Sequence, residues 1–333
     1  MKLRIIGLIG VLAFGLLAAS LPAEAQQAGK VYRIGFLRTG SGSPITSPVG
    51  IAFRQRLREL GYVEGQNLVI EYRSTEGKRE RRPEIAAELV RLKVDVIVTQ
   101  GGSPGLIRAA QRATHTIPIV MTGSHVDPVE VGLVVSLARP GGNITGLTNL
   151  AAKLHAKQLE LLKEAFPRIS RVAILWPRSH QHHAMKEVEA VGQALGIQIQ
   201  SLVVTGRRLI SLESAFSAIT RERSDGLLVV TTSSTLGPRA RIIEFTANRR
   251  LPTIYDNSLF VDAGGLMSYG TDFQHLYRRV ATYVDKILKG AKPGDLPVEQ
   301  PRKFDLVINL KKAKELGLTI PPQFLARANK VIK

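Results

Sequence analysis

A glycine-rich loop with a central serine has the residues of either a nucleophilic or an anion-binding site. Gly101-Gly102-Ser103-Pro104-Gly105 fits the G-x-S-x-G pattern of a nucleophile elbow and lies between a strand-like run and a helical segment. Pro104, however, has no backbone N–H, and the N–H after the nucleophile is one that the oxyanion hole needs. No downstream pair of Asp and His stands out as completing a triad. We therefore expect no enzyme and keep a serine hydrolase only as a remote alternative.

The same loop suits a carboxylate better. Its glycines, Gly102 among them, let the backbone approach a ligand, and free N–H groups at the start of the helix after Ser103 favour an anion. The alternative is that Ser103 is an ordinary N-cap residue with Pro104 in the first helical position, and both interpretations can hold. Ser41 and Ser43 could add donors, or their Gly- and Ser-rich loop could simply be flexible.

Further candidates follow other strand-like runs. Trp176, the only tryptophan, could stack on a ligand or pack in the core. Tyr255 and Tyr269 could offer hydroxyls to an amino group. Asp127 and Asp256 could pair with a ligand ammonium, although the sequence favours a hinge or turn role for each. The remaining candidate ligand-binding residues are threonines near strand ends or chain crossings: Thr39, Thr122, Thr148 and Thr231.

Metal and nucleotide chemistry have weaker support. His180, His182 and His183 could bind a metal weakly, but zinc sites usually draw their ligands from more dispersed positions, so we expect an exposed loop here. The chain has no cysteine, which excludes disulfides and thiolate ligands. Gly40-Ser41-Gly42 lacks the third glycine of a dinucleotide-binding fingerprint. We therefore expect neither a metal nor a cofactor.

Alternating strand-like and helical segments would position these residues. Short apolar runs such as Val31–Leu37 and Val94–Thr99 alternate with helical patterns such as Ile51–Leu60, and a further helix is expected over Pro128–Leu137. This alternation predicts a parallel sheet with helices on both faces. Ligands of such sheets bind beyond the carboxyl ends of the strands, which is where the candidate residues lie.

A second series of the same kind follows the loop Arg139–Asn143. Its expected strands are Val172–Trp176, Ile197–Val204, Gly226–Val230 and Thr253–Tyr255. The chain is therefore expected to contain two similar α/β units in tandem. The tail is less regular, with a helix at Leu276–Leu288 and a strand at Phe304–Ile308. This pattern suggests that the chain crosses back to the first unit and then returns to the second.

Composition limits the class of partner. The chain has 333 residues and a net charge of +19, and 44% of its residues are hydrophobic, which is ordinary for a globular protein. Its basic residues are dispersed, and the densest run, Lys78–Arg82, lies at an expected loop-to-helix junction. No basic stripe is interleaved with aromatic residues, so we expect no nucleic-acid binding.

The N-terminus has the pattern of a cleavable signal peptide over residues 1–25. Lys2 and Arg4 precede the apolar run Ile5–Ala19, and Ala23-Glu24-Ala25 supplies the small residues of a cleavage site. The apolar run is shorter than the roughly 20 residues that a spanning helix needs. Because no cysteine is present to accept a lipid, we expect a freely diffusing periplasmic protein that is not lipid-anchored.

Four segments resemble a large bacterial family of periplasmic solute-binding proteins of ABC transporters, relatives of the tryptophan- and tyrosine-binding ones. The segments are Phe53–Asn67, Arg139–Thr148, Ala263–Gly270 and Phe304–Pro321. The resemblance implies an α/β fold of two Rossmann-like lobes with parallel sheets, the type I periplasmic-binding-protein fold, with a three-stranded hinge. It implies that a solute binds between the lobes by hinge closure and that an inner-membrane ABC permease recognises the closed form.

Together these features predict the solute-binding component of an ABC importer, a monomer that carries an amino acid or a related carboxylate. We expect the first lobe to contain residues 30–147 and 257–293, and the second residues 148–256 and 294–333. One alternative is an exported sensor that presents its bound ligand to a membrane receptor. A sugar-responsive repressor would share the fold, but it would need a DNA-binding module where this chain has its expected signal peptide.

Overall fold

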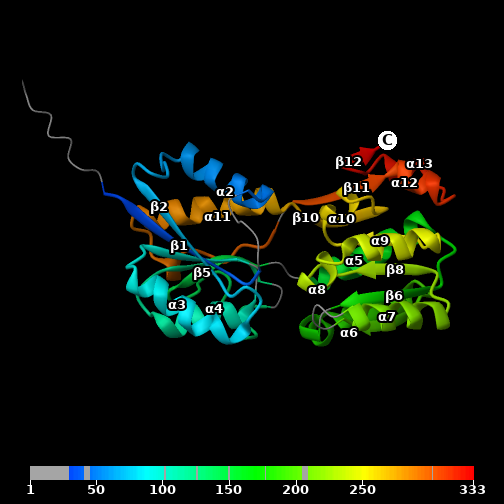
Figure 1. Ribbon diagram of the computed structural model, residues 1–333, viewed down its shortest axis with the longest axis horizontal. Coiled ribbons are helices and arrows are strands. Elements are labelled where there is room, and N and C mark those ends of the chain that lie inside the picture. Colours follow the sequence, from blue (N-terminus) through cyan, green and yellow to red (C-terminus); the bar gives the residue numbers. More distant parts are fainter. Residues whose placement is uncertain are drawn as a thin grey trace, which may run out of the picture.

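Two α/β lobes lie side by side along the long axis of the molecule (Figure 1). The computed structural model describes residues 30–40, 46–100, 103–124, 127–148, 151–176, 178–204, 209–301 and 303–333. The expected signal peptide therefore lies outside the described residues. Each lobe is built around one sheet, and helices cover both faces of each sheet.

The first lobe contains a five-stranded parallel sheet in the order β2-β1-β3-β4-β5. Its strands are β1 (Tyr32–Arg38), β2 (Leu68–Ser74), β3 (Val96–Gln100), β4 (Ile119–Ser124) and β5 (Ile144–Thr148). Helices α2 (Pro48–Glu59) and α11 (Phe273–Leu288) cover one face, and α3 (Arg82–Arg91) and α4 (Pro104–Ala113) cover the other. The turn of 3-10 helix η1 (Arg79–Arg81) leads into α3.

Burial on both faces explains the continuous apolar runs of these strands. Val96 and Val98 point into the core shared with α2 and α11, whereas Ile97, between them, points into the core shared with α3 and α4. A strand with two buried faces has no polar alternation. The prediction of a parallel sheet covered on both faces is therefore confirmed.

The second lobe contains a seven-stranded sheet in the order β12-β11-β10-β9-β8-β6-β7, and within it only β10 and β11 pair in the antiparallel sense. Its strands are β6 (Arg171–Trp176), β7 (Gln198–Val203), β8 (Gly226–Val229), β9 (Thr253–Tyr255), β10 (Met267–Thr271), β11 (Phe304–Asn309) and β12 (Lys330–Ile332).

Two groups of helices pack on the faces of this sheet. The first group is α5 (Ala151–Ala165), α6 (Arg178–Ala194), α12 (Leu310–Glu315) and α13 (Pro322–Leu325). The second is α7 (Leu209–Arg221), α9 (Arg239–Asn248) and α10 (Ser258–Asp262). The short helix α8 (Ser233–Leu236) follows β8, and the 3-10 turn η2 (Pro293–Asp295) follows α11.

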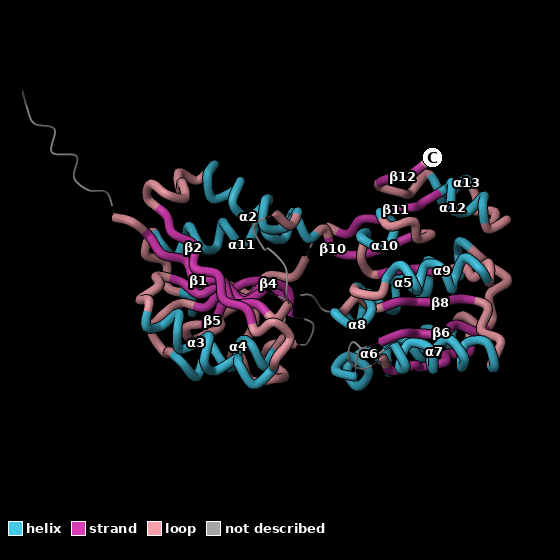
Figure 2. Tube along the Cα trace, in the orientation of Figure 1, coloured by secondary structure: helices cyan, strands magenta, loops and turns pink. Residues whose placement is uncertain are grey.

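The chain passes between the lobes after β5, after β10 and before β11, as the positions of β10, α11 and β11 show (Figure 2). Helix α11 packs in the first lobe, where Val280 shares a core with Phe53. Leu147 of β5 then forms a β-bridge with Glu299, and β11 returns to the second sheet. The prediction that the tail crosses back and returns is confirmed.

The grouping of strands corrects two of the expected lobe assignments. β10 pairs with β9, so the stretch 258–271 lies with the second sheet and not with the first lobe. Conversely, the backbone N–H of Val298 donates to Leu137, and that of Glu299 donates to Gly146, so this stretch lies against the first sheet. The sequence pattern shows where strands form, but pairing partners decide to which lobe a strand belongs.

Three local expectations were wrong. Pro128–Leu137 forms turns and not a helix, because Gly132 adopts a positive φ of 66° that ends any helical path. β5 was not expected, since its sequence is interrupted by Gly146. That glycine is required there, because a Cβ atom would lie 2.3 Å from the carbonyl oxygen of Met121. The His180–His183 segment belongs to α6 and is not a loop.

Candidate ligand-binding site

Polar side chains come together where strands β1, β3 and β4 of the first lobe end. Arg38 and Gln100 are the last residues of β1 and β3, and Thr122 lies in β4. Tyr277 reaches the same strand ends from the buried face of α11. Thr122 Oγ1 donates to the carbonyl of Thr99 at 2.9 Å and lies 3.3 Å from the Tyr277 hydroxyl oxygen.

This cluster is partly desolvated. Burial raises the pKa of Tyr277 to about 12, although hydrogen bonds with Thr122 and Gln100 and the charge of Arg38 act in the opposite direction. Burial lowers the pKa of Arg38, and the neighbouring Tyr277 raises it. A guanidinium nevertheless stays protonated in proteins at neutral pH. The first lobe therefore has a fixed positive charge at its strand ends with a buried hydroxyl beside it, and such a charge is suited to a carboxylate.

A carboxylate lies at the corresponding edge of the second lobe. Asp256 follows β9, and its Oδ1 accepts hydrogen bonds from the backbone N–H of Thr231, at 2.9 Å, and from the Thr231 hydroxyl. Thr232 caps α8 directly afterwards, which fixes the path of this loop. β6 and β8 point toward the first lobe, so this carboxylate lies at the end of the second sheet that faces the first lobe (Figure 1).

Two aromatic candidates lie in the core of the second lobe. Trp176 is fully buried, and its indole N–H donates to Ser201 Oγ at 2.9 Å. Tyr255 is also fully buried and stacks on Phe260 with the ring centroids 4.5 Å apart. Burial raises the pKa of the Tyr255 hydroxyl. Both side chains therefore pack in the core of the second lobe, and neither exposes a surface that a ligand could contact.

Several other candidates have local structural roles. The Asp127 carboxylate accepts from the backbone N–H of Val129 at 2.8 Å and so stabilises the turn that begins there. The Thr39 carbonyl accepts from the backbone N–H of Gly77 at 2.8 Å. Thr148 is fully buried, and its backbone N–H donates to the carbonyl of Glu299 at 2.9 Å.

The remaining candidates are Tyr269, Ser103 and three residues outside the described part of the chain. Tyr269 is half-buried and stacks on Phe304. Ser103 occupies the N-cap position of α4 with Pro104 as the first helical residue, but its hydroxyl makes no capping hydrogen bond. The residues outside the described ranges are Ser41, Ser43 and Gly102. The anion-binding role of this loop stays a prediction.

Sequence reasoning missed Arg38, Gln100 and Tyr277 as site residues. Arg38 and Gln100 end two strands, and ligands were expected beyond the carboxyl ends of strands, so their polar side chains were the available signal. Tyr277 gave no local signal, because it is 155 residues away from Thr122 in the chain and reaches the site through the packing of α11.

A buried histidine was also missed. His155 of α5 is fully buried, with Nδ1 2.9 Å from Gln158 Oε1 and its ring against Trp176. Its Nε2 has no hydrogen-bond partner among the described residues. Burial lowers the pKa of His155 to about 4, so the ring is neutral at physiological pH. Gln158 then donates to the carbonyl of Tyr269 at 2.5 Å and connects α5 to β10.

A cavity of about 350 Å³ lies where the chain crosses between the lobes. Two ion pairs line it: Arg279 with Glu299, at 2.5 Å, and Lys303 with Asp272, at 3.0 Å. Asp272 also caps α11 by accepting from the backbone N–H of His275. These contacts fix the crossing segments relative to α11.

Neither a membrane span nor a metal cluster was found in the described residues. Within those ranges, no helix is both long and apolar enough to cross a membrane. The same part of the chain contains no group of three or more potential His, Cys, Asp or Glu ligands placed to hold a metal. The side chains of His180, His182 and His183 lie outside the description, so the expectation that they hold no metal stays a prediction.

Two lobes with predominantly parallel sheets, joined by three chain crossings and with strand ends that face each other, define the type I periplasmic-binding-protein fold. Comparison with known families agrees with this class. Residues 49–332 match the model of the ABC transporter substrate binding protein family, and the chain belongs to that family.

Individual relatives support the same assignment. A tyrosine-binding protein of Clostridioides difficile (strain R20291) is 28% identical over 268 residues, which cover 80% of this chain and 75% of the relative. A conserved domain protein from Vibrio cholerae O1 biovar eltor has a TM-score of 0.80 at 28% identity, covering 91% of this chain and all of that one. An ABC domain from Streptococcus pneumonia in complex with L-Trp has a TM-score of 0.79 at 26% identity, covering 90% and 99% of the two chains.

Proposed function

We propose that this protein is the solute-binding component of an ABC importer and carries an amino acid or a related carboxylate between its lobes. The observation that carries this proposal is the placement of opposite charges at the facing strand ends. Arg38, beside Tyr277, would bind the ligand carboxylate, and Asp256, oriented by Thr231, would bind its ammonium group. Relatives that are named for tyrosine or hold L-Trp support an amino acid as the ligand.

Delivery would follow from hinge closure. Rotation of the lobes about the three crossings would bring the two charged edges onto opposite ends of one ligand. The closed form would then dock on an inner-membrane permease as a monomer, without catalysis and without nucleic acid. We place the mature protein in the periplasm, exported by the signal peptide over residues 1–25 and not lipid-anchored, since the chain has no cysteine.

Calorimetric titration with a panel of amino acids, small carboxylates and sugars tests the ligand class. Arg38→Gln should weaken the binding of the best amino acid by about 10- to 150-fold, because a hydrogen bond to a charged group contributes about 1.5–3 kcal/mol. Arg58→Gln is the matched control, since Arg58 is an exposed arginine of α2. It should bind like the unmodified protein.

Two results would contradict the proposal. Binding of sugars with no response to any amino acid or carboxylate would exclude the ligand class. Equal affinity of the Arg38→Gln and Arg58→Gln variants would exclude Arg38 as the group that binds the ligand. Asp256→Asn tests the ammonium end of the ligand independently of its carboxylate end. It should weaken the binding of amino acids more than the binding of carboxylates that lack an ammonium group.

A further inference from the structure

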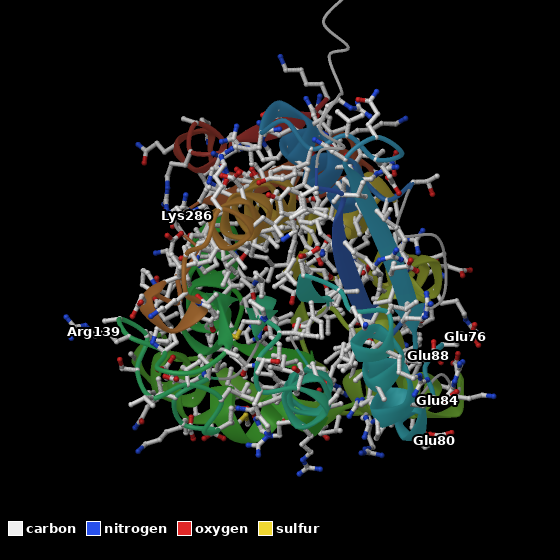
Figure 3. All side chains as sticks on the ribbon, turned by 90° about the vertical axis from the view of Figure 1, so that its left-hand side faces the viewer. Glu76, Glu80, Glu84, Glu88, Arg139 and Lys286 are labelled. Atoms are coloured by element: carbon white, nitrogen blue, oxygen red, sulfur yellow. The ribbon has the colours of Figure 1, made fainter. Side chains whose placement is uncertain are left out.

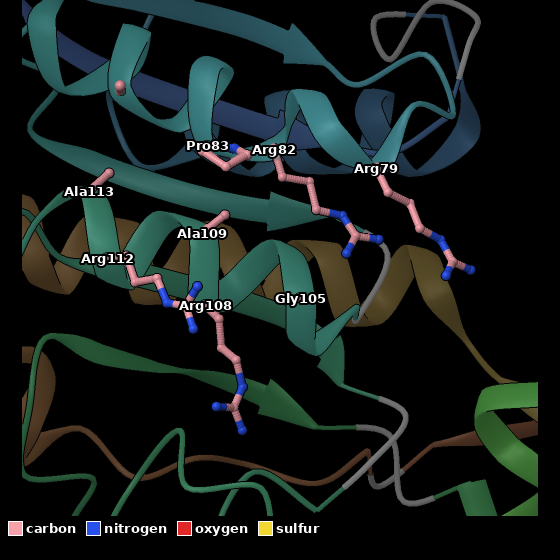
Figure 4. A pocket seen from close by; sticks show the side chains of 9 residues that line it. Arg79, Arg82, Pro83, Gly105, Arg108, Ala109, Arg112 and Ala113 are labelled. Atoms are coloured by element: carbon pink, nitrogen blue, oxygen red, sulfur yellow. The ribbon is translucent and has the colours of Figure 1, made fainter.

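A groove lined by arginines lies between α3 and α4, on the face of the first sheet opposite α2 and α11 (Figure 4). Its volume is about 420 Å³. Small side chains form its apolar surface: Ala87 from α3, and Ala109 and Ala113 from α4, with Gly105 in the first turn of α4. The four arginines are Arg79, Arg82, Arg108 and Arg112.

The arginines of the groove lack a paired carboxylate in the described part of the chain. None of the four forms an ion pair with any residue that the structure describes, and Arg108 donates instead to the carbonyl of Val131. The basic residues are dispersed along the sequence, but the fold brings four of them together in this groove. Arg79 and Arg82 belong to the densest basic run of the sequence.

The neighbouring acidic residues are directed elsewhere. Glu76, Glu80, Glu84 and Glu88 follow one another at intervals of four residues along one outer side of η1 and α3 (Figure 3). Arg81 pairs with Glu76 at 3.4 Å and with Glu84 at 3.6 Å, and Arg73 pairs with Glu88 at 2.7 Å. Three of the four glutamates therefore pair with arginines that do not line the groove.

The position of Arg82 in the groove is electrostatically unfavourable. Its Nε atom is buried and has no hydrogen-bond partner among the described residues. Its Nη1 atom lies 2.3 Å from the position that a Cβ atom of residue 105 would occupy, so a side chain at Gly105 would displace the guanidinium from its place over the first turn of α4. Burial, and after it the charge of Arg79, lowers the pKa of Arg82. An anion would relieve both the missing hydrogen bond and the repulsion.

We propose that the groove between α3 and α4 binds a phosphate oxyanion through Arg79, Arg82, Arg108 and Arg112. Guanidinium groups bind phosphate oxygens with two parallel hydrogen bonds, and four of them favour a multiply charged group over a single carboxylate. The ligand is a free phosphate compound such as pyrophosphate, or the headgroup of an anionic phospholipid. The groove is separate from the strand ends of the candidate ligand-binding site, so the two ligands would not compete.

Titration calorimetry with pyrophosphate at low ionic strength tests the site. The Arg82→Gln/Arg108→Gln double variant should bind at least tenfold more weakly than the unmodified protein. A second pair, Arg79→Gln/Arg112→Gln, changes only exposed arginines, so it keeps the test valid if the first pair fails to fold. The control is Arg58→Gln/Arg91→Gln, which removes two exposed arginines outside the groove and should bind pyrophosphate normally.

Flotation with vesicles separates the two sources of phosphate. Binding to phosphatidylglycerol vesicles but not to phosphatidylcholine vesicles, lost in the groove variants, would assign the lipid headgroup. Binding of pyrophosphate alone, with the same loss, would assign a soluble ligand. The proposal is wrong if the unmodified protein binds neither pyrophosphate nor phosphatidylglycerol vesicles. It is also wrong if the control pair loses as much affinity for pyrophosphate as the groove pairs do, or if citrate binds as tightly as pyrophosphate.

Discussion

At the scale of single residues, His155 shows how burial rather than solvent sets a charge state. Its pKa falls to about 4 in the folded protein from an ordinary value of 6.5, so the unfolded chain binds one more proton between these two pH values. The contribution of His155 to folding stability should therefore be fully present above pH 6.5 and should fall as the pH drops toward 4. The loss that belongs to this residue should be about 3 kcal/mol.

Urea denaturation of His155→Gln at several pH values measures this effect. Glutamine at position 155 does not bind a proton in this range. The difference in unfolding free energy between the variant and the unmodified protein should therefore shrink by about 3 kcal/mol from pH 7 to pH 4. Carboxylates titrate equally in both proteins and cancel in the difference. His115→Gln, at an exposed position, is the control. A difference that stays constant over this range would show that the folded protein protonates His155 as readily as the unfolded chain does.

The residue scale also shows what the sequence can reveal about the site. Ligands were expected beyond the carboxyl ends of strands, and Arg38 and Gln100 end two of these strands. The choice among side chains was less successful, because Trp176 and Tyr255 are buried by helices that pack on the second sheet. Burial of a strand's last residue depends on those neighbours, and a local pattern does not contain them.

At the scale of elements, α11 belongs to the first lobe although β10, directly before it, belongs to the second. Apolar residues at helical spacing bury one face of α11 against the sheet and α2. A buried polar contact adds to this packing: the Tyr62 hydroxyl donates to Asp285 Oδ1 at 3.0 Å across 223 residues of sequence. Lys289 also pairs with the same carboxylate at 2.7 Å.

Tyr62→Phe should destabilise the fold by about 1–3 kcal/mol, because it leaves a buried carboxylate with one donor fewer. Chemical denaturation measures the change directly. Tyr72→Phe is a suitable control, since the Tyr72 ring packs on Phe36 but its hydroxyl has no hydrogen-bond partner in the described residues. Equal stability of the two variants would mean that the contact between Tyr62 and Asp285 does not hold α11 in place.

The elements were predicted best where both faces of a strand are buried. Thr253–Tyr255 was expected with the bounds that β9 has, because a short β-branched and aromatic run has few alternatives. β5 and β12 were not expected, and both are short strands at the edges of their sheets. β5 is buried along its whole length but is interrupted by Gly146, and β12 has only three residues, so pairing with a neighbour defines these strands more than their own composition does.

At the scale of the whole molecule, the proposed capture of a ligand would require the two lobes to move as bodies about the three crossings. Each lobe has its own cores, and the ion pairs Arg279–Glu299 and Lys303–Asp272 lie at the crossings. In the proposed closure each lobe would therefore keep its own packing, and the lobes would change their relative orientation. A ligand can shift this equilibrium only by binding the closed form more tightly than the open one.

Small-angle X-ray scattering tests this last expectation. A saturating amino acid that binds in the calorimetric panel should reduce the radius of gyration of the unmodified protein, because closure brings two separate masses together. Arg38→Gln at the same ligand concentration should keep the larger radius, since it lacks the group proposed to bind the ligand carboxylate. The Arg82→Gln/Arg108→Gln variant should close like the unmodified protein, because its groove lies on the face of the first sheet opposite α11. Tight binding without any decrease in radius would exclude hinge closure as the means of capture.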